Sequence, residues 1–80
     1  MAVTYAKKKN MYLYAKEVLQ INVPVLKDCI YRFSRGWEWL EFCDGDYMCY
    51  KITFSGKLKH VVVFYYDDDC NKHVVRNEWL

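Results

Sequence analysis

Three runs with the alternation of β-strands, separated by two tight-turn signals, lie between Trp37 and Tyr66 and most constrain the fold. The runs are Trp37–Cys43, Tyr47–Phe54 and Lys57–Tyr66, and the turn signals are Asp44-Gly45 and Ser55-Gly56. Successive side chains of a strand point to opposite faces, and here large apolar residues fall on both faces. We expect a chain of 80 residues to cover only one face and to leave the other as a contact surface.

Composition predicts one folded domain over residues 1–80. The chain is 54% apolar and contains 8 Tyr, 4 Phe and 3 Trp, whereas disordered chains lack such residues. The formal charge of +2 is neither the strong basic excess of most nucleic-acid-binding proteins nor the acidity of a DNA mimic.

Targeting signals are absent from the sequence, so we expect a cytoplasmic protein without membrane association. No apolar run approaches the roughly 20 residues that span a bilayer. The N-terminus also lacks the basic, apolar and small-residue pattern of a secretion signal. In a reducing compartment the cysteines are expected to be free thiols, namely Cys29, Cys43, Cys49 and Cys70.

The N-terminal half is predicted to be helical after a flexible basic leader at residues 1–10. A short helix is favoured over Asn10–Gln20, although residues 11–14 and 18–23 also fit strands. A second helix is predicted over Val23–Arg35, because Pro24 suits a first helical turn and Gly36 a helix end. Its apolar stripe is Leu26, Cys29, Ile30 and Phe33.

The tail, Lys72–Leu80, alternates as a fourth strand would, and a short helix is the alternative. The predicted fold is therefore α+β, with one or two N-terminal helices packed on a three- or four-stranded antiparallel β-meander.

The turn signals also predict the strand register. A two-residue turn at Asp44-Gly45 places Glu38 opposite Lys51 and Trp39 opposite Tyr50. Continuing the count through Ser55-Gly56 places Tyr47 beside Phe64, whereas a three-residue loop would reverse the faces of the third strand. One face then holds Trp37, Trp39, Met48, Tyr50, Ile52, Phe54, Val61, Val63 and Tyr65, and should receive the helices. The other holds Leu40, Phe42, Tyr47, Cys49, Leu58, Val62, Phe64 and Tyr66, with Glu38, Lys51 and His60 at one end.

This second face is the predicted partner-binding site. Tyr47, Phe64 and Tyr66 are expected to be apolar anchors, because aromatic side chains dominate interface energetics. The full set of expected site residues is Tyr47, Phe64, Tyr66, Phe42, Lys51, His60 and Glu38. The competing interpretation is that the N-terminal segment or the tail buries this face.

A single-stranded nucleic-acid-binding sheet is the alternative function. Aromatic residues on a sheet can stack bases while lysines such as Lys51 contact phosphates. The small net charge and the acidic run Asp67-Asp68-Asp69 beside the aromatic end of the third strand weigh against it.

Signals for metal binding or catalysis are weak. Cys70 and His73 have the spacing of half a zinc site, but no second close pair exists. Cys49 and His60 share a face, yet no glycine-rich oxyanion loop adjoins Cys49. We therefore expect no metal, no cofactor and no enzymatic activity.

The sequence thus favours a small non-enzymatic protein-binding module, acting through an aromatic sheet face or a sheet edge. Inhibition of a larger complex is one such role. This size and composition are shared by small stand-alone binding proteins, including phage-encoded anti-CRISPR proteins, and no motif here singles out that group. A homodimer that pairs the two second faces or an open strand edge is a further expectation.

Overall fold

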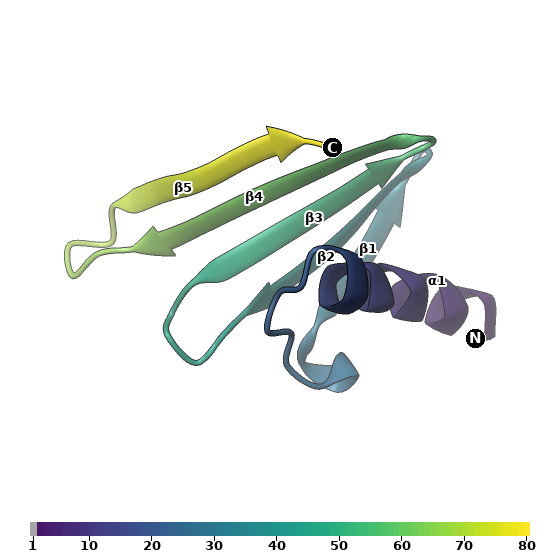
Figure 1. The fold of residues 1–80 in the computed structure, drawn as a ribbon, viewed down its shortest axis with the longest axis horizontal. Helices are drawn as coiled ribbons and strands as arrows, with labels where there is room; N and C mark the ends of the chain where they lie inside the picture. The colour runs from purple at the N-terminus through teal and green to yellow at the C-terminus, as the bar shows by residue number, and fades with distance from the viewer. Residues whose placement is uncertain (1) are drawn as a thin grey trace.

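The computed structural model describes residues 2–80, with side chains from Thr4 onward. It shows an N-terminal helix packed on a five-stranded antiparallel sheet (Figure 1). The strands follow chain order, β1-β2-β3-β4-β5. The expected α+β class and antiparallel meander are confirmed. The expected number of strands, three or four, is wrong, because a segment predicted to be helical forms a fifth strand.

The helix begins much earlier than predicted. α1 spans Ala2–Leu13 and continues as a π-helical turn, η1, over Tyr14–Val18. The predicted leader is therefore helical over residues 2–10, while Met1 lies outside the described residues. No glycine or proline interrupts this stretch, so the lysine run can remain helical at the surface. The helix favoured over Asn10–Gln20 is the C-terminal part of this longer element, and Gln20, with φ 56°, ends it.

The second predicted helix, Val23–Arg35, is wrong. The segment contains a short 3-10 turn, η2 (Leu26–Asp28), followed by strand β1 (Ile30–Ser34). Its apolar residues also alternate, since Cys29, Tyr31 and Phe33 share one face of a strand. Tertiary packing selects this alternation, because β1 pairs with β2 and Cys29, just before β1, lies in the core at 3% exposure.

Gly36, predicted to end a helix, is instead part of a hairpin turn. Ser34 lies opposite Trp37, and the two residues between them, Arg35 and Gly36, have φ of 49° and 83°. Two consecutive positive φ values define the type I′ turn, which suits the twist of paired strands.

The remaining strands match the predicted runs closely. β2 spans Trp37–Cys43, β3 spans Cys49–Ser55, β4 spans Leu58–Tyr66 and β5 spans Lys72–Trp79. The strand favoured for the tail is thus confirmed. β5 is an edge strand, and it lies on the side of the sheet farthest from α1 (Figure 1).

The β2–β3 loop is longer than predicted. Cys43 lies opposite Cys49, so five residues, Asp44–Met48, connect the strands instead of a two-residue turn. Lys51 therefore pairs with Glu41 and not with Glu38. A shift by an odd number of residues moves every side chain of β2 to the other face of the sheet relative to β3.

This shift changes which residues of β2 are buried. Leu40 and Phe42, expected on the second face, lie in the core at 0% and 4% exposure. Trp37 and Trp39, expected beneath the helices, lie on the opposite face. The prediction of the two faces is therefore wrong for β2.

The β3–β4 turn is displaced by one residue. Ser55 lies opposite Leu58, so Gly56-Lys57 forms the turn. Gly56 has φ 58°, as the first central position of a type II′ turn requires. Phe64 consequently pairs with Cys49 and not with Tyr47. This register differs from the predicted one by two residues, so β3 and β4 keep their predicted faces.

The core lies between the helical segment and the face of the sheet that we call the covered face. Tyr14 also packs edge-on against Phe54, with ring centroids 5.2 Å apart. The buried apolar residues are Met11, Ala15, Cys29, Leu40, Phe42, Ile52, Val61 and Val63.

Candidate functional site

The face of the sheet opposite α1, which we call the open face, carries exposed apolar side chains. Leu19, Ile21 and Val23 pack with the helix against the core, and no helix of residues 2–80 lies on the open face. The exposed fraction is 59% for Trp79, 56% for Tyr66 and 40% for Trp37. The apolar residues of the open face are Ile30, Trp37, Trp39, Leu58, Val62, Phe64, Tyr66, Val74 and Trp79. These apolar residues come from β1, β2, β4 and β5, whereas the open-face residues of β3 are Cys49, Lys51, Thr53 and Ser55. An exposed apolar surface of this kind is typical of an interaction site.

Contacts between strands hold several of these side chains in place. The His60 ring stacks on Trp79, with centroids 4.4 Å apart, and its Nε2 lies 2.6 Å from Asn77 Oδ1. The Lys72 ammonium lies 4.2 Å from the Phe64 ring centroid. Lys51 extends over Trp39 at 5.7 Å. Such contacts reduce the entropy that a partner must remove on binding.

Five of the seven predicted site residues lie on or beside the open face. Phe64 and Tyr66 pack edge-to-face with centroids 5.8 Å apart. Lys51 and His60 belong to the same face, and both are half-buried. Tyr47 lies in the β2–β3 loop with 85% of its surface exposed.

The other two predicted site residues, Phe42 and Glu38, belong to the covered face. Phe42 stacks on Tyr50 with centroids 5.1 Å apart. The Glu38 carboxylate accepts a hydrogen bond of 2.7 Å from the Tyr31 hydroxyl. Burial, together with this bond and the Glu38 charge, raises the pKa of Tyr31 to about 12. The predicted placement of both residues on the second face is wrong, because it depended on the two-residue loop.

Sequence reasoning missed the three tryptophans of the open face. Trp37 and Trp39 were assigned to the core by the wrong register, and Trp79 to a tail of uncertain structure. Trp79 can be assigned to the open face only when the register between the tail and β4 is known, because this register places Trp79 opposite His60. The spacing of Cys43 and Cys49 around a five-residue segment was the available signal for the longer loop.

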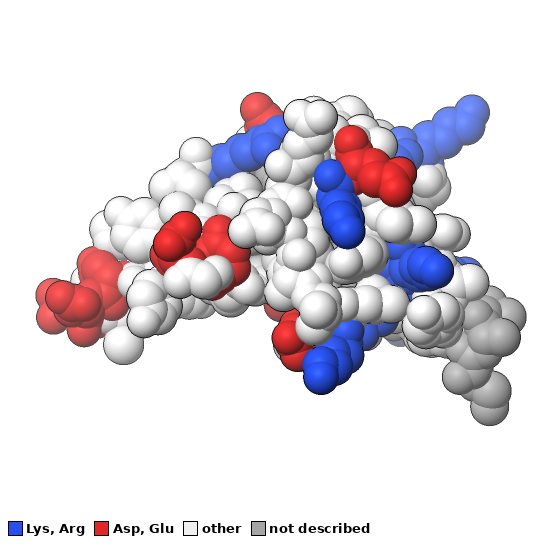
Figure 2. Space-filling view, turned by 60° about the horizontal axis from the view of Figure 1, so that its bottom comes forward, with Lys and Arg blue, Asp and Glu red and all other residues white. Residues whose placement is uncertain are grey.

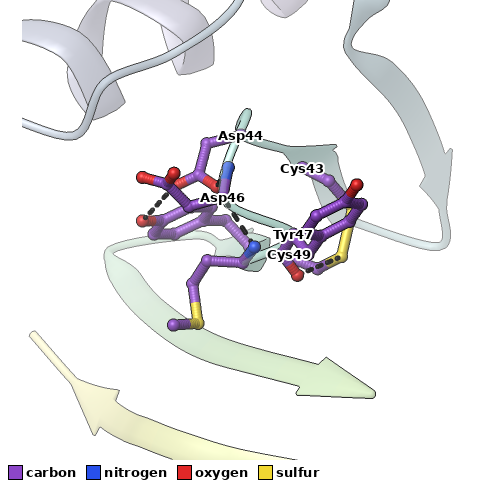
Figure 3. Close-up of a disulfide and its surroundings, with 7 residues drawn as sticks. Cys43, Asp44, Asp46, Tyr47 and Cys49 are labelled. Carbon is purple, nitrogen blue, oxygen red and sulfur yellow. Dashed lines mark hydrogen bonds between the residues drawn. A yellow bond between two sulfur atoms is a disulfide. The ribbon is translucent and has the colours of Figure 1, made fainter. Parts of the chain in front are cut away.

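A disulfide joins Cys43 to Cys49 at the end of the β2–β3 hairpin (Figure 3). The two residues face one another, and Asp44 N donates to Met48 O at 2.9 Å just beyond them. This arrangement is that of a non-hydrogen-bonded pair, whose side chains approach most closely. The expectation of free thiols is therefore wrong for these two cysteines. Cys29 and Cys70 are thiols, and burial raises the pKa of Cys29.

The Asp44 carboxylate organises the loop that the disulfide closes (Figure 3). Its Oδ1 accepts hydrogen bonds from the backbone N–H groups of Asp46, at 2.8 Å, and Met48, at 3.1 Å. Its Oδ2 accepts one from the Tyr50 hydroxyl at 3.2 Å. Tyr47 adopts φ 63°, which turns its side chain out to solvent.

The β4–β5 loop, Asp67–Asn71, repeats this arrangement. Asp67 Oδ1 accepts from the N–H groups of Asp69 and Asn71, both at 2.9 Å. Its Oδ2 lies 2.7 Å from His73 Nε2, six residues along the chain, as Tyr50 is from Asp44. Cys70 has φ 63°, the value found at Tyr47. The His73 contact and the two N–H groups lower the pKa of Asp67.

Cys70 and His73, which have the spacing of half a zinc site, have no further metal ligands grouped with them among the described residues. His73 is hydrogen-bonded to Asp67, and Cys70 is exposed at the loop. Within residues 2–80, no three His, Cys, Asp or Glu side chains are grouped so as to hold a metal ion.

Two adjoining cavities lie beside the disulfide, and we call them together the disulfide hollow. Their volumes are about 360 and 560 Å³, and both are lined by Cys43, Cys49 and Tyr66. Phe64 also lines the first cavity, and Tyr47 the second. The hollow therefore lies at the end of the open face that adjoins the two aspartate loops.

Charge is unevenly distributed along the molecule. The β2–β3 and β4–β5 loops emerge at the same end of the sheet, and their aspartates form an acidic tip at the left of Figure 2. On the face that Figure 2 shows, Lys and Arg side chains lie away from this tip. Away from the loops, the open face carries Arg32 and Lys51 against Glu41, and Lys72 lies opposite Tyr66 at the end next to the β4–β5 loop.

Comparison with known proteins identifies no relative. No family model, no curated protein and no solved structure matches the chain. Across the described residues, α1 is too short and too polar to cross a bilayer, and the other helical turns are shorter still.

Proposed function

We propose that this chain is a protein-binding module that docks a partner on its open face. The observation that carries the proposal is the exposure of Trp37, Tyr66 and Trp79 on one continuous sheet surface. Trp and Tyr are the residue types most enriched among the energetically dominant positions of interfaces. Each buries roughly 150–250 Å² when covered, at about 25 cal/mol per Å² of apolar area. A few such residues can supply the affinity of a specific complex.

The open face is a better docking surface than the free edge of β5. A bulge between Val63 and Phe64 disturbs the pairing of β4 with β5, and bulges of this kind hinder strand addition at an edge. The edge strand also carries Lys72 and Arg76, which oppose the approach of a further strand.

We propose binding without catalysis. Cys49, which shares the open face with His60, has its sulfur in the disulfide and is not available as a nucleophile. His60 is occupied by Asn77 and Trp79. A partner held on this face would be inhibited by occlusion of whatever surface it contributes.

The proposal is tested by comparing substitutions of two tyrosines with the same exposure. Tyr66, on the open face, and Tyr5, on α1, are each 56% exposed. Immobilised variants are used to capture proteins from the native host, and the captured proteins are quantified by mass spectrometry. We expect at least one protein to be retained by the unchanged chain and by Tyr5→Ala, and to be reduced about tenfold or more with Tyr66→Ala.

Trp79→Ala is the second open-face variant, because Trp79 lies outside the disulfide hollow. It should also lose the captured protein. Near-UV circular dichroism establishes that each variant is folded. Equal capture by the unchanged chain and all three variants would contradict the proposal.

Single-stranded nucleic acid is the second candidate ligand of the same face. Arg32, Lys51 and Lys72 lie among its aromatic rings, and this arrangement favours stacking with phosphate contacts. Titration of a labelled oligonucleotide at two salt concentrations separates the candidates. Saturable binding that weakens steeply with salt would support nucleic acid, because bound cations release counterions.

A homodimer that pairs two open faces is a further alternative. It would double the mass measured by sedimentation at micromolar concentration.

A further inference from the structure

We propose that the disulfide hollow receives the guanidinium group of an arginine from the partner protein. This inference rests on the proposed function and specifies the chemistry of the partner. It comes from three features of the hollow that occur together: its shape, its unneutralised carboxylates and its exposed aromatic rings.

The hollow has room for a side chain at the end of the docking surface. Its two cavities, of about 360 and 560 Å³, meet at Cys43, Cys49 and Tyr66. Volumes of a few hundred Å³ are those of sites that hold small ligand groups. The disulfide and the aspartate-bonded loop restrict this end of the sheet, so the hollow exists before any partner arrives.

Carboxylates line both cavities, and no Lys or Arg lines either. Asp28 and Glu41 belong to the first, and Asp44 and Asp68 to the second. None of these four forms an ion pair within the described chain, where the pairs are His73–Asp67 and Arg76–Glu78. An incoming cation would therefore find negative charge that the chain itself leaves unpaired.

Among the described residues, Lys51 forms no ion pair with Glu41, although the two lie opposite one another. Its ammonium instead lies 5.7 Å from the Trp39 ring centroid. Glu41 thus remains available at the edge of the hollow.

Aromatic rings on the hollow can accept the flat face of a cation. Tyr47 and Tyr66 are 85% and 56% exposed. Phe64, which also lines the first cavity, already has the Lys72 ammonium 4.2 Å from its ring centroid, so Tyr47 and Tyr66 are the rings that a further cation would contact. A guanidinium is planar, stacks on rings and forms paired hydrogen bonds with a carboxylate, so it fits this lining better than a compact ammonium. The same carboxylates repel a phosphate group.

The test uses acetyl-arginine methylamide as the probe and the citrulline derivative, which has the same shape without the charge, as its control. Each is titrated into the ¹⁵N-labelled chain while amide shifts are followed by NMR. We expect saturable shifts at Cys49, Tyr66 and Asp68 with the arginine derivative only. Half-saturation should lie in the millimolar range, on the order of 1 mM, as is usual for one weakly held group.

Charge-removing substitutions locate the site. Glu41→Gln and Asp68→Asn should each raise the half-saturation concentration about threefold. Asp69→Asn makes the same change one residue away, at a side chain that lines neither cavity. This variant should leave the half-saturation concentration unaltered.

Equal shifts with the citrulline derivative, or no saturable shift at all, would overturn the inference. So would an Asp69→Asn effect as large as that of Asp68→Asn. These outcomes leave the proposed function standing if Trp79→Ala still abolishes partner capture. Conversely, arginine binding without any dependence of capture on Trp79 would support the hollow and contradict the open face as a docking surface.

Discussion

Single aspartates determine the shape of both loops at the acidic end of the sheet. Asp44 and Asp67 each use one carboxylate oxygen to hold two backbone N–H groups and the other to hold a side chain six residues later. Short polar side chains commonly bond to nearby backbone in this way and stabilise turns. The residue that follows in the left-handed region, Tyr47 or Cys70, is then displayed to solvent.

Removing the Asp44 carboxylate should destabilise the whole domain. Asp44→Ala loses three hydrogen bonds, two of them to backbone donors, so we expect the free energy of unfolding to fall by about 1–3 kcal/mol. Urea unfolding followed by tryptophan fluorescence measures this change.

Asp46→Ala is the matched control in the same loop. The Asp46 side chain is exposed and takes part in no hydrogen bond among the described residues, so its loss should alter the free energy by less than about 0.5 kcal/mol. Equal effects of the two substitutions would show that charge at this end, and not the Asp44 bonds, matters.

At the scale of residues, the sequence predicted the sheet face of a side chain correctly where strand parity was right. Lys51, His60, Phe64 and Tyr66 lie on β3 and β4, whose relative faces survived a register shift of two. Phe42 and Glu38 lie on β2, where an odd shift exchanged the faces. Alternation divides the side chains of one strand between the two faces of the sheet. The length of the connecting loop then determines which residues of the next strand share each face.

At the scale of elements, the two aspartate loops show that the disulfide is not required for the loop conformation. The β4–β5 loop repeats the hydrogen bonds and the positive φ of the β2–β3 loop, with Tyr66 and Lys72 in the places of the cysteines. The Cys43–Cys49 bond therefore adds stability and a wall of the hollow to a hairpin that the aspartate already shapes.

The double variant Cys43→Ser/Cys49→Ser should remain folded. Closing a loop with a sequence separation of only 6 restricts the unfolded chain modestly, so we expect a loss of about 2 kcal/mol. Far-UV circular dichroism should be unchanged, and urea unfolding should stay cooperative. Cys70→Ser serves as the control, and a noncooperative double variant would mean that the disulfide is needed for folding.

The elements were predictable where alternation and turn residues agreed. β2, β3 and β4 follow from such signals. The Asp44-Gly45 pair was misleading, because an Asp-Gly pair is typical of a two-residue turn but here begins a five-residue loop. β1 was not predictable, because the segment fits both periodicities: Cys29, Ile30 and Phe33 form a helical stripe, whereas Cys29, Tyr31 and Phe33 alternate as in a strand. Pairing with β2 decided between them.

At the scale of the whole molecule, one helical segment covers one side of a five-stranded sheet. β5 extends the sheet beyond the helix, and its side chains are almost all exposed (Figure 1). The sequence expectation of a contact surface followed from this shortage of covering segments, although its tryptophans were misplaced. If the proposed docking surface is correct, the acidic tip predicts that a partner presents positive charge at that end.

The most direct test of the open face is hydroxyl-radical footprinting of the free chain and of the chain bound to its captured partner. We predict that Tyr66, Trp79 and Tyr5 are all oxidised readily in the free chain, since each is more than half exposed. In the complex, Tyr66 and Trp79 should be protected while Tyr5 remains reactive. Protection of Tyr5 with continued oxidation of Tyr66 and Trp79 would place the partner on the helix and contradict the account.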